Sequence, residues 1–443
     1  MSTVFERLGP GFVFGAATAS YQIEGSVHAD GRGESIWDRF SHTPGTIKDD
    51  ATGDVACDHY RLWRDDVALI RALGMDAYRF SIAWPRVLPE GVGAVNQKGL
   101  DFYDRLVDEL LAQGIAPYPT LYHWDLPQAL EDRGGWTSRA TAEAFAEYCG
   151  IVADRLGDRI QRWGTINEPW CIAELGYRFG THAPGRQDPQ AALDASHHVM
   201  LAHGLGTAAV RSAAPRAEVG FVCNVDEQAP RSSHPDDVAV ARLADAFRNR
   251  WWLDPVFLGS YPEDGVEARA WDQAVVLDGD LDVISQPLDF LGINYYSRTI
   301  VGADHLTDAD RPEVTSPTLP KTTMGWEIHP RGLRDLLVRF NEDYDLPDVL
   351  VTENGVALPD RLVDGAVHDP GRIEYLETHF AATADAIDAG VPVKGFFIWS
   401  LMDNFEWGEG LTQRFGVVWT NYEDQRRIVK DSGHWLAEHL RAR

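Results

Sequence analysis

Short apolar runs alternate with amphipathic stretches along the 443 residues of the chain. The runs are rich in β-branched and aromatic residues, which is typical of strands buried on both faces of a sheet. We expect eight such strands, at residues 12–17, 76–82, 115–121, 161–167, 218–223, 288–294, 348–353 and 394–400. The stretches between them carry apolar residues at the spacing of one helix face. We expect helices around the apolar stripes at 60–70, 100–111, 333–340 and 373–387.

The alternation of strand and helix predicts a parallel sheet, and eight repeats predict its closure into a single (β/α)8 TIM barrel over residues 1–443. An open doubly wound sheet is the competing architecture. It would normally place a glycine-rich phosphate loop after its first strand, and the segment 15–18 (Gly-Ala-Ala-Thr) is not one. Segments 18–57 and 295–328 follow strand ends, so we expect long loops that wall a deep pocket. We expect the polar, proline-containing segment 301–322 to be mobile.

Two of the predicted strands end in a glutamate. The run at 348–353 ends in Glu353, followed by Asn354, and the run at 161–167 leads into Asn167 and Glu168. Catalytic groups of parallel sheets lie at the carboxyl ends of the strands. One buried Asn-Glu pair could equally be a structural hydrogen-bond node. Two such glutamates at one end of a barrel favour a pair of catalytic carboxyls.

The other strand ends carry amides, acids, histidine and tryptophan. They are Gln22, Arg79, His123, Trp124, Asn167, Asn294, Tyr295, Tyr296, Trp399, Glu406 and Trp407. Amides and acids bind hydroxyl groups, and an indole face packs on the apolar face of a pyranose ring. Phosphate sites need glycine-rich loops and nicotinamide sites a G-x-G-x-x-G motif, and the sequence has neither. The strand ends therefore favour a sugar as ligand.

Charge and cysteine content exclude several partners. Forty Lys+Arg against 68 Asp+Glu give a net charge of −28, which argues against binding nucleic acid or anionic membranes.

Four cysteines without paired spacing predict reduced thiols and a cytoplasmic protein. We find neither a signal peptide nor an apolar run of the ~20 residues that span a bilayer. We expect no cofactor and no metal, because His198 and His203 lack the i,i+4 spacing of a helical zinc pair.

Several motifs resemble those of glycoside hydrolase family 1, the β-glucosidases. The strand-end motifs Thr-Ile-Asn-Glu-Pro (165–169) and Val-Thr-Glu-Asn-Gly (351–355) resemble the family's acid/base and nucleophile signatures. The segment 12–25 resembles its N-terminal signature, and further matches lie at 78–86, 121–127, 292–296 and 399–407. The motifs occur in family order over nearly the whole chain.

The resemblance implies a role for each matching residue. Glu168 matches the general acid/base and Glu353 the nucleophile, which Arg79 and Tyr296 would hold. The residues that would bind the sugar in the cavity are Gln22, His123, Trp124, Asn167, Glu406 and Trp407, with Trp399 as stacking platform, Trp326 on the leaving-group side and Asn294 in support. One departure from the family pattern is Leu411, where tyrosine is frequent, and we expect it to alter only loop packing.

The chemistry of glycosidic bond cleavage requires different protonation states of the two acids. A retaining enzyme needs an ionised nucleophile and a protonated acid about 5–5.5 Å apart. We expect Arg79 and Tyr296 to keep Glu353 ionised, and burial and the charge of Glu353 to keep Glu168 protonated. An anionic Glu406 would repel a sugar phosphate, so we expect unphosphorylated substrates.

The resulting hypothesis is a retaining β-glucosidase that acts on cellobiose and aryl β-glucosides, in cellulose degradation. A β-galactosidase or β-fucosidase of the same family is the alternative within this class. A non-catalytic sugar-binding relative is the alternative from another class, and such a protein would be expected to lack one of the two acids.

Overall fold

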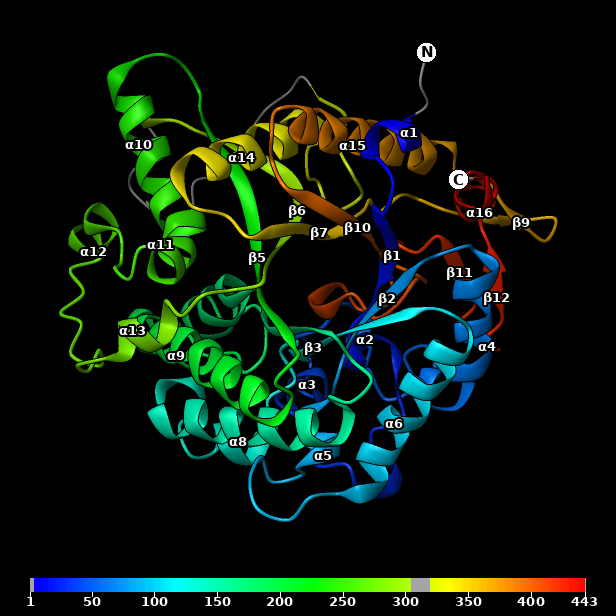
Figure 1. Ribbon diagram of the computed structural model, residues 1–443, viewed down its shortest axis with the longest axis horizontal. Coiled ribbons are helices and arrows are strands. Elements are labelled where there is room, and N and C mark those ends of the chain that lie inside the picture. Colours follow the sequence, from blue (N-terminus) through cyan, green and yellow to red (C-terminus); the bar gives the residue numbers. More distant parts are fainter. Residues whose placement is uncertain (1–3, 304–318, 443) are drawn as a thin grey trace.

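The structure is a computed structural model that describes residues 4–303 and 319–442. Its centre is a closed barrel of parallel strands in the order β1-β10-β7-β6-β5-β4-β3-β2 (Figure 1). The strands are β1 (Val13–Ala17), β2 (Ala77–Ser81), β3 (Ala116–Tyr122), β4 (Arg162–Asn167), β5 (Glu218–Pro230), β6 (Phe290–Val301), β7 (Asp348–Asn354) and β10 (Val393–Trp399). The predicted TIM barrel is confirmed, and the open-sheet alternative is wrong because β1 pairs with both β10 and β2.

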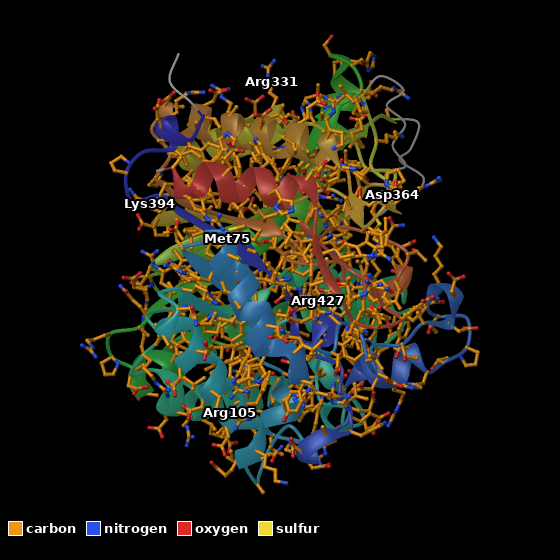
Figure 2. All side chains as sticks on the ribbon, turned by 90° about the vertical axis from the view of Figure 1, so that its right-hand side faces the viewer. Met75, Arg105, Arg331, Asp364, Lys394 and Arg427 are labelled. Carbon is orange, nitrogen blue, oxygen red and sulfur yellow. The ribbon has the colours of Figure 1, made fainter. Side chains whose placement is uncertain are left out.

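Helices surround the barrel, as Figure 1 shows. The long ones are α4 (His59–Ala72), α6 (Gln97–Ala112), α8 (Arg139–Leu156), α9 (Pro189–Ala213), α14 (Pro330–Asp343), α15 (Pro370–Asp388) and α16 (Asp431–Arg441). Their apolar stripes face the core: in α4, for example, Trp63, Val67 and Ile70 are buried. Leu111, at the edge of the stripe predicted for α6, is 40% exposed instead. Charged side chains such as Arg105 and Arg331 lie at the periphery (Figure 2).

Shorter elements fill the connections between strands and helices. The helices are α1 (Val4–Leu8), α2 (Ser20–Ile23), α3 (Ile36–Ser41), α5 (Trp84–Val87), α7 (Gln128–Glu131), α10 (Pro235–Asp245), α11 (Trp251–Phe257), α12 (Glu263–Ala268), α13 (Asp280–Ile284) and the π-helices η4 (Cys171–Arg178) and η5 (Ala246–Arg250). Two small hairpins pair β8 (Leu362–Val363) with β9 (Ala366–Val367) and β11 (Val418–Thr420) with β12 (Arg427–Val429).

Two strands run further than their apolar patterns predict. β5 and β6 stay paired as far as Pro230 and Val301, with a register shift between Val225 and Glu227. The extension is half-exposed and polar, so it carries no apolar run, and its pairing rather than its burial makes it a strand. Segment 224–230, which the pattern assigns to a loop, is therefore a ribbon above the barrel. Most of the segment predicted to be mobile, 301–322, lies outside the described residues.

A buried ion cluster fixes the loop that follows β10. Lys430 Nζ lies 2.5 Å from Asp360 Oδ2 and 2.7 Å from Asp403 Oδ1, and all three side chains are at most 3% exposed. Arg414 Nη1 binds the other oxygen of Asp403 at 2.8 Å. Charges of both signs balance in the cluster, because an unpaired buried charge would be costly. The loop it anchors leads directly to Glu406.

Candidate active site

Glu353 lies near the end of β7, and both of its carboxyl oxygens accept hydrogen bonds. Arg79, from β2, donates from Nη1 to Oε1 at 2.5 Å, and the hydroxyl of Tyr296 donates to Oε2 at 2.7 Å. The side chain of Glu353 is 4% exposed and that of Arg79 is 3% exposed. A cation and a hydroxyl donor both favour the anion, so the site holds Glu353 as a carboxylate.

Glu168 follows the last residue of β4 and lies in the opposite environment. Its backbone has a φ of 50°, in the left-handed region that non-glycine residues rarely adopt, and its N–H donates to the carbonyl of Val222 at 2.9 Å. Such strain is frequent at functional sites. Burial and, after it, the negative charge of Glu353 raise the pKa of Glu168 to about 7. Near neutral pH this carboxyl can therefore both carry and release a proton.

Asn167 connects the surroundings of the two acids. Its Oδ1 accepts from Arg79 Nη2 at 2.7 Å and from Asn294 Nδ2 at 3.1 Å, while Asn294 Nδ2 also donates to Glu168 Oε1 at 2.7 Å. Because Oδ1 faces these donors, Nδ2 of Asn167 faces His123 Nε2, 3.0 Å away. Nε2 must then accept, which places the hydrogen of the neutral ring on Nδ1. Burial and the charge of Arg79 lower the pKa of His123 well below its ordinary value, in agreement with a neutral ring.

Two polar atoms beside the acids have no partner. Among the described residues, neither His123 Nδ1 nor Gln22 Oε1 has a hydrogen-bond partner, although both are buried. The orientation of Gln22 is fixed, because its Nε2 donates to Asn404 Oδ1 at 3.0 Å and to the carbonyl of Phe405 at 2.9 Å. Unpaired buried polar atoms are costly, so a donor and an acceptor left open in one region indicate a polar ligand.

Glu406 differs from the sequence-based expectation. It was expected to be anionic, but burial and then the charge of Glu353 raise its pKa to about 8. At neutral pH most of the carboxyl is therefore protonated. The anionic state is disfavoured first by burial and then by the charges of Glu353 and Glu168. Glu406 therefore gives no charge-based reason for the expected preference for unphosphorylated sugars.

Aromatic rings form one wall of the site. Trp399 stacks on His123 with centroids 5.9 Å apart, and Trp407 lies 4.6 Å from Trp124. The indole N–H of Trp124 donates to the carbonyl of Asn167 at 2.9 Å, so Trp124 offers a ring face rather than a donor. Trp326 lies on the other side, 5.5 Å from Tyr296.

The two acids line one cavity of about 980 Å³. Of the residues predicted to form the site, those on its lining are Glu168, Glu353, His123, Trp124, Asn294, Tyr296, Trp326, Trp399, Glu406 and Trp407. Arg79, Asn167 and Gln22 are buried and bind residues of the lining, and Oε1 of Gln22 stays open beside them in the part of the chain that the structure describes. The predicted residues thus form two groups: those that line the cavity, and those that orient the lining residues through hydrogen bonds.

Sequence reasoning missed the charged wall on one side of the cavity. Three arginines lie there, each paired with an acid: Arg248 with Asp226 at 2.9 Å, Arg269 with Glu174 at 2.6 Å, and Arg298 with Glu327 at 2.8 Å. No motif marks them, because each partner comes from a different element. It also missed Cys171, whose sulfur lies 3.2 Å from Glu168 Oε2. Its position three residues after Glu168, in a helical segment, is a signal that could have found it.

The histidines considered as possible metal ligands instead form hydrogen bonds inside the fold. His198 and His203 are buried in α9, where they bind the carbonyl of Trp136 and the hydroxyl of Thr165. The described residues contain no group of three or more His, Cys, Asp or Glu that could hold a metal ion. In the same part of the chain, no helix is both long and apolar enough to cross a membrane. All four cysteines are free and buried.

A parallel barrel with two strand-end carboxyls facing one polar, tryptophan-lined cavity defines the class of glycoside hydrolases. Comparison with known proteins specifies the group within this class. The model of glycosyl hydrolase family 1 matches residues 5–443, and the chain belongs to this family.

Relatives cover almost the whole chain. Beta-glucosidase A of Thermotoga maritima is 48% identical over 98% of this chain and 97% of its own length. A bifunctional beta-D-glucosidase/beta-D-fucosidase of Bifidobacterium breve is 46% identical over 99% of both chains. The solved structure of a beta-glucosidase from Thermotoga maritima in complex with glucoimidazole superposes with a TM-score of 0.95, at 47% identity and 98% coverage of both chains. The expected family is confirmed.

Proposed function

We propose that the chain is a retaining β-glucosidase that releases terminal, non-reducing β-D-glucosyl residues, with Glu353 as nucleophile and Glu168 as general acid/base. The observation that carries the proposal is the contrast between two acids in one cavity. Glu353 accepts hydrogen bonds from Arg79 and Tyr296, whereas burial and the charge of Glu353 raise the pKa of Glu168 to about 7. Two carboxyls whose environments separate their protonation states are suited to nucleophilic and acid catalysis.

The reaction uses this contrast twice. A carboxylate oxygen of Glu353 attacks the anomeric carbon while the bond to the leaving oxygen breaks and Glu168 gives that oxygen its proton. The negative charge of Glu353 is then consumed in an ester, so the pKa of Glu168 falls and the group is ionised. Glu168 next takes a proton from water, whose oxygen attacks the anomeric carbon and frees Glu353. Two displacements at one carbon retain its configuration.

The sugar would meet the open polar atoms beside the acids. Gln22 Oε1 would accept from a hydroxyl and His123 Nδ1 would donate to one, since neither has a partner among the described residues. Glu406, mostly protonated at neutral pH, would add a donor and an acceptor. Trp399 would support the apolar face of the pyranose. Each hydroxyl bound in this way removes the cost of an unpaired buried atom.

Cellobiose and aryl β-glucosides are the substrates that this site favours, with a role in cellulose degradation. The Bifidobacterium breve relative is a bifunctional beta-D-glucosidase/beta-D-fucosidase, which supports β-fucosides as a second substrate class. β-Galactosides differ from glucosides only at one hydroxyl. Both acids are present, which disfavours a non-catalytic sugar-binding protein. Four unpaired, buried thiols favour a cytoplasmic location.

A panel of p-nitrophenyl β-glycosides tests the proposal. We expect the glucoside to be hydrolysed, and release of β-glucose as first product, followed by NMR, would establish retention. Glu353→Gly should abolish turnover, and azide should restore it with the inverted α-glucosyl azide as product, because azide fills the space of the carboxylate. A β-glucosyl azide from this variant would refute the role of Glu353 as nucleophile.

A further inference from the structure

The two oxygens of Glu168 have different partners. Oε1 accepts from Asn294 Nδ2 at 2.7 Å. The amide of Asn294 cannot turn without loss, because its Oδ1 accepts from the hydroxyl of Thr352 at 2.7 Å. Asn294 therefore always presents an N–H group to Oε1, and the unprotonated, carbonyl-type oxygen of a carboxylic acid is the better acceptor for it. The proton of the acid form belongs on Oε2.

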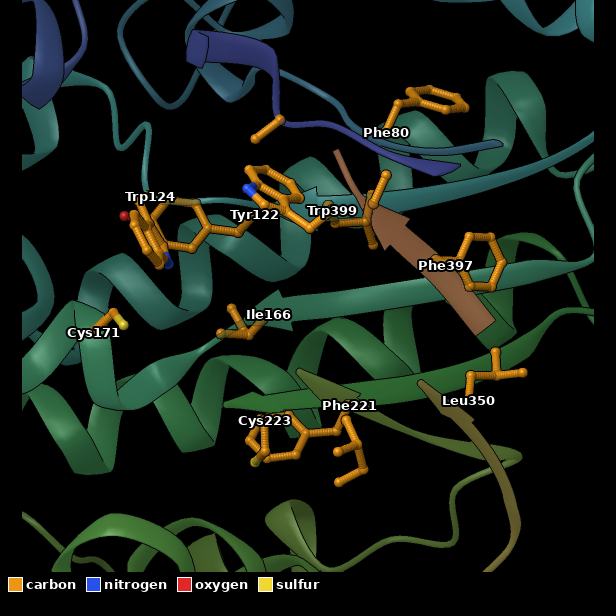
Figure 3. Packing of buried hydrophobic residues seen from close by; sticks show 14 of the residues in the cluster. Phe80, Tyr122, Trp124, Ile166, Cys171, Phe221, Cys223, Leu350, Phe397 and Trp399 are labelled. Carbon is orange, nitrogen blue, oxygen red and sulfur yellow. The ribbon is translucent and has the colours of Figure 1, made fainter. Parts of the chain in front are cut away.

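Cys171 is the partner of Oε2. Its sulfur lies 3.2 Å from this oxygen, and its backbone N–H donates to the carbonyl of Glu168 at 3.0 Å, which fixes the thiol beside the acid. Cys171 begins η4, beyond the end of the strand that carries Ile166 (Figure 3). A thiol donates and accepts weak hydrogen bonds by rotation of its hydrogen alone. It is thus suited to an oxygen that is protonated in one step and ionised in the next.

A second acceptor faces the same thiol. The nearest amide atom of Asn224 lies 3.3 Å from Sγ. With the amide turned so that its oxygen accepts from Arg248 Nη1 and Nη2, at 3.0 and 3.1 Å, this atom is the oxygen. The thiol can then donate its hydrogen to either of two acceptors. It donates to Asn224 when Oε2 carries the proton, and to Oε2 when Glu168 is ionised.

We propose that Cys171 is a positioning residue whose thiol reverses its hydrogen bond with the state of Glu168: Sγ accepts from Oε2–H of the acid until the leaving oxygen takes that proton, and the thiol donates to Oε2 in the base. The inference rests on the proposed function of Glu168. Cys171 keeps its own proton throughout, because burial and then the charge of Glu168 raise the pKa of the thiol well above its ordinary value. Only a hydrogen rotates, and no bond to sulfur is broken.

Several other titratable or charged groups lie around Glu168 and also affect its protonation. The titratable and charged side chains around it, on β5, β6, β7, η4, η5 and the loop after β10, are Cys223, Tyr296, Glu353, Cys171, Arg248 and Glu406. Of these, Cys171 is the one whose contact with Oε2 is a hydrogen bond, and that bond lowers the pKa of Glu168. Removing it should therefore change the pH profile without changing the nucleophile.

The test compares Cys171→Val, which cannot form the bond, with Cys171→Ser, which keeps a rotatable hydrogen. The buried Cys149 of α8 provides the matched control, as Cys149→Ala. In the pH profile of kcat/KM on p-nitrophenyl β-glucoside, the basic limb reports the pKa of Glu168. The valine variant should raise this pKa by about 0.5–1 unit, as expected for loss of a weak donor to an anion. With 2,4-dinitrophenyl β-glucoside, kcat depends on Glu168 as base. The pKa of the acidic limb in the pH profile of kcat should therefore rise by the same amount. The serine variant should keep the wild-type limbs or lower them, and the control should not move.

Superimposable profiles of the wild type and a folded valine variant would overturn the proposal, as would equal shifts for serine and valine. Cys171→Ala replaces the valine variant if circular dichroism shows that the latter does not fold. Titration of the Glu168 carboxyl by ¹³C NMR gives the same comparison without turnover. If the wild-type chain hydrolysed no glycoside, the proposed function would fail, and this titration would still decide the role of the thiol.

Discussion

Glu168→Ala separates the acid role of Glu168 from its role as base, because leaving groups differ in their need for a proton. General acid catalysis contributes about 10²–10⁴-fold, or about 3–5 kcal/mol. For cellobiose, whose leaving alkoxide must be protonated, kcat/KM should fall by that factor. For 2,4-dinitrophenyl β-glucoside, whose leaving anion is stable, kcat/KM should stay within about tenfold of the wild type.

The pH dependence of kcat/KM provides a second, independent test of the acid role of Glu168. The protonated form of Glu168 acts in the first step, and its pKa is raised to about 7 by burial and the charge of Glu353. With cellobiose, wild-type kcat/KM should fall about tenfold for each pH unit above this value. With the dinitrophenyl substrate, the alanine variant should lack that limb.

Azide provides the readout for the base role. It should restore kcat of the alanine variant on the dinitrophenyl substrate and yield β-glucosyl azide, because the glycosyl-enzyme accepts a nucleophile on the face that Glu168 vacated. Glu168→Gln, which keeps an acceptor for Asn294, is the matched control for folding and should lose activity on cellobiose to a similar extent. Equal losses on both substrates would refute the acid role and indicate a disturbed site.

Three further predictions rest on individual contacts and charges of the structure. Tyr296→Phe removes the 2.7 Å bond to Glu353 while keeping the ring; we expect kcat to fall about 10–100-fold, from about 1.5–3 kcal/mol per charge-assisted bond, and an unchanged kcat would contradict the contact's role. Lys430→Met removes the cation between Asp360 and Asp403 and leaves the buried cluster with one uncompensated negative charge, although Arg414 still pairs with Asp403; we expect a loss of about 3–5 kcal/mol in the free energy of unfolding, measured by urea denaturation, and an unchanged midpoint would count against the ion cluster. A 6-phospho-β-glucoside should be hydrolysed far more slowly than the glucoside, since its dianion would meet the carboxylate of Glu353; faster turnover of the phosphate would disprove this.

The sequence by itself determined the barrel and the positions of both acids. Eight apolar runs predicted eight barrel strands because burial on both faces leaves an uninterrupted hydrophobic pattern. Glu168 and Glu353 could be singled out because each follows such a run directly, and strand ends meet at one end of a barrel. Local pattern was sufficient wherever a residue's environment followed from its own strand.

The tertiary structure alone decided how these residues are charged and held. Glu406 is mostly protonated because Glu353 and Glu168, far away in the chain, share its buried surroundings. The tautomer of His123 follows from Asn167, whose amide is oriented by Arg79 and Asn294. The β5–β6 ribbon exists through pairing that no apolar run marks. Protonation and hydrogen-bond direction depend on distances and dielectric surroundings, and these are set only when segments from different strands come together.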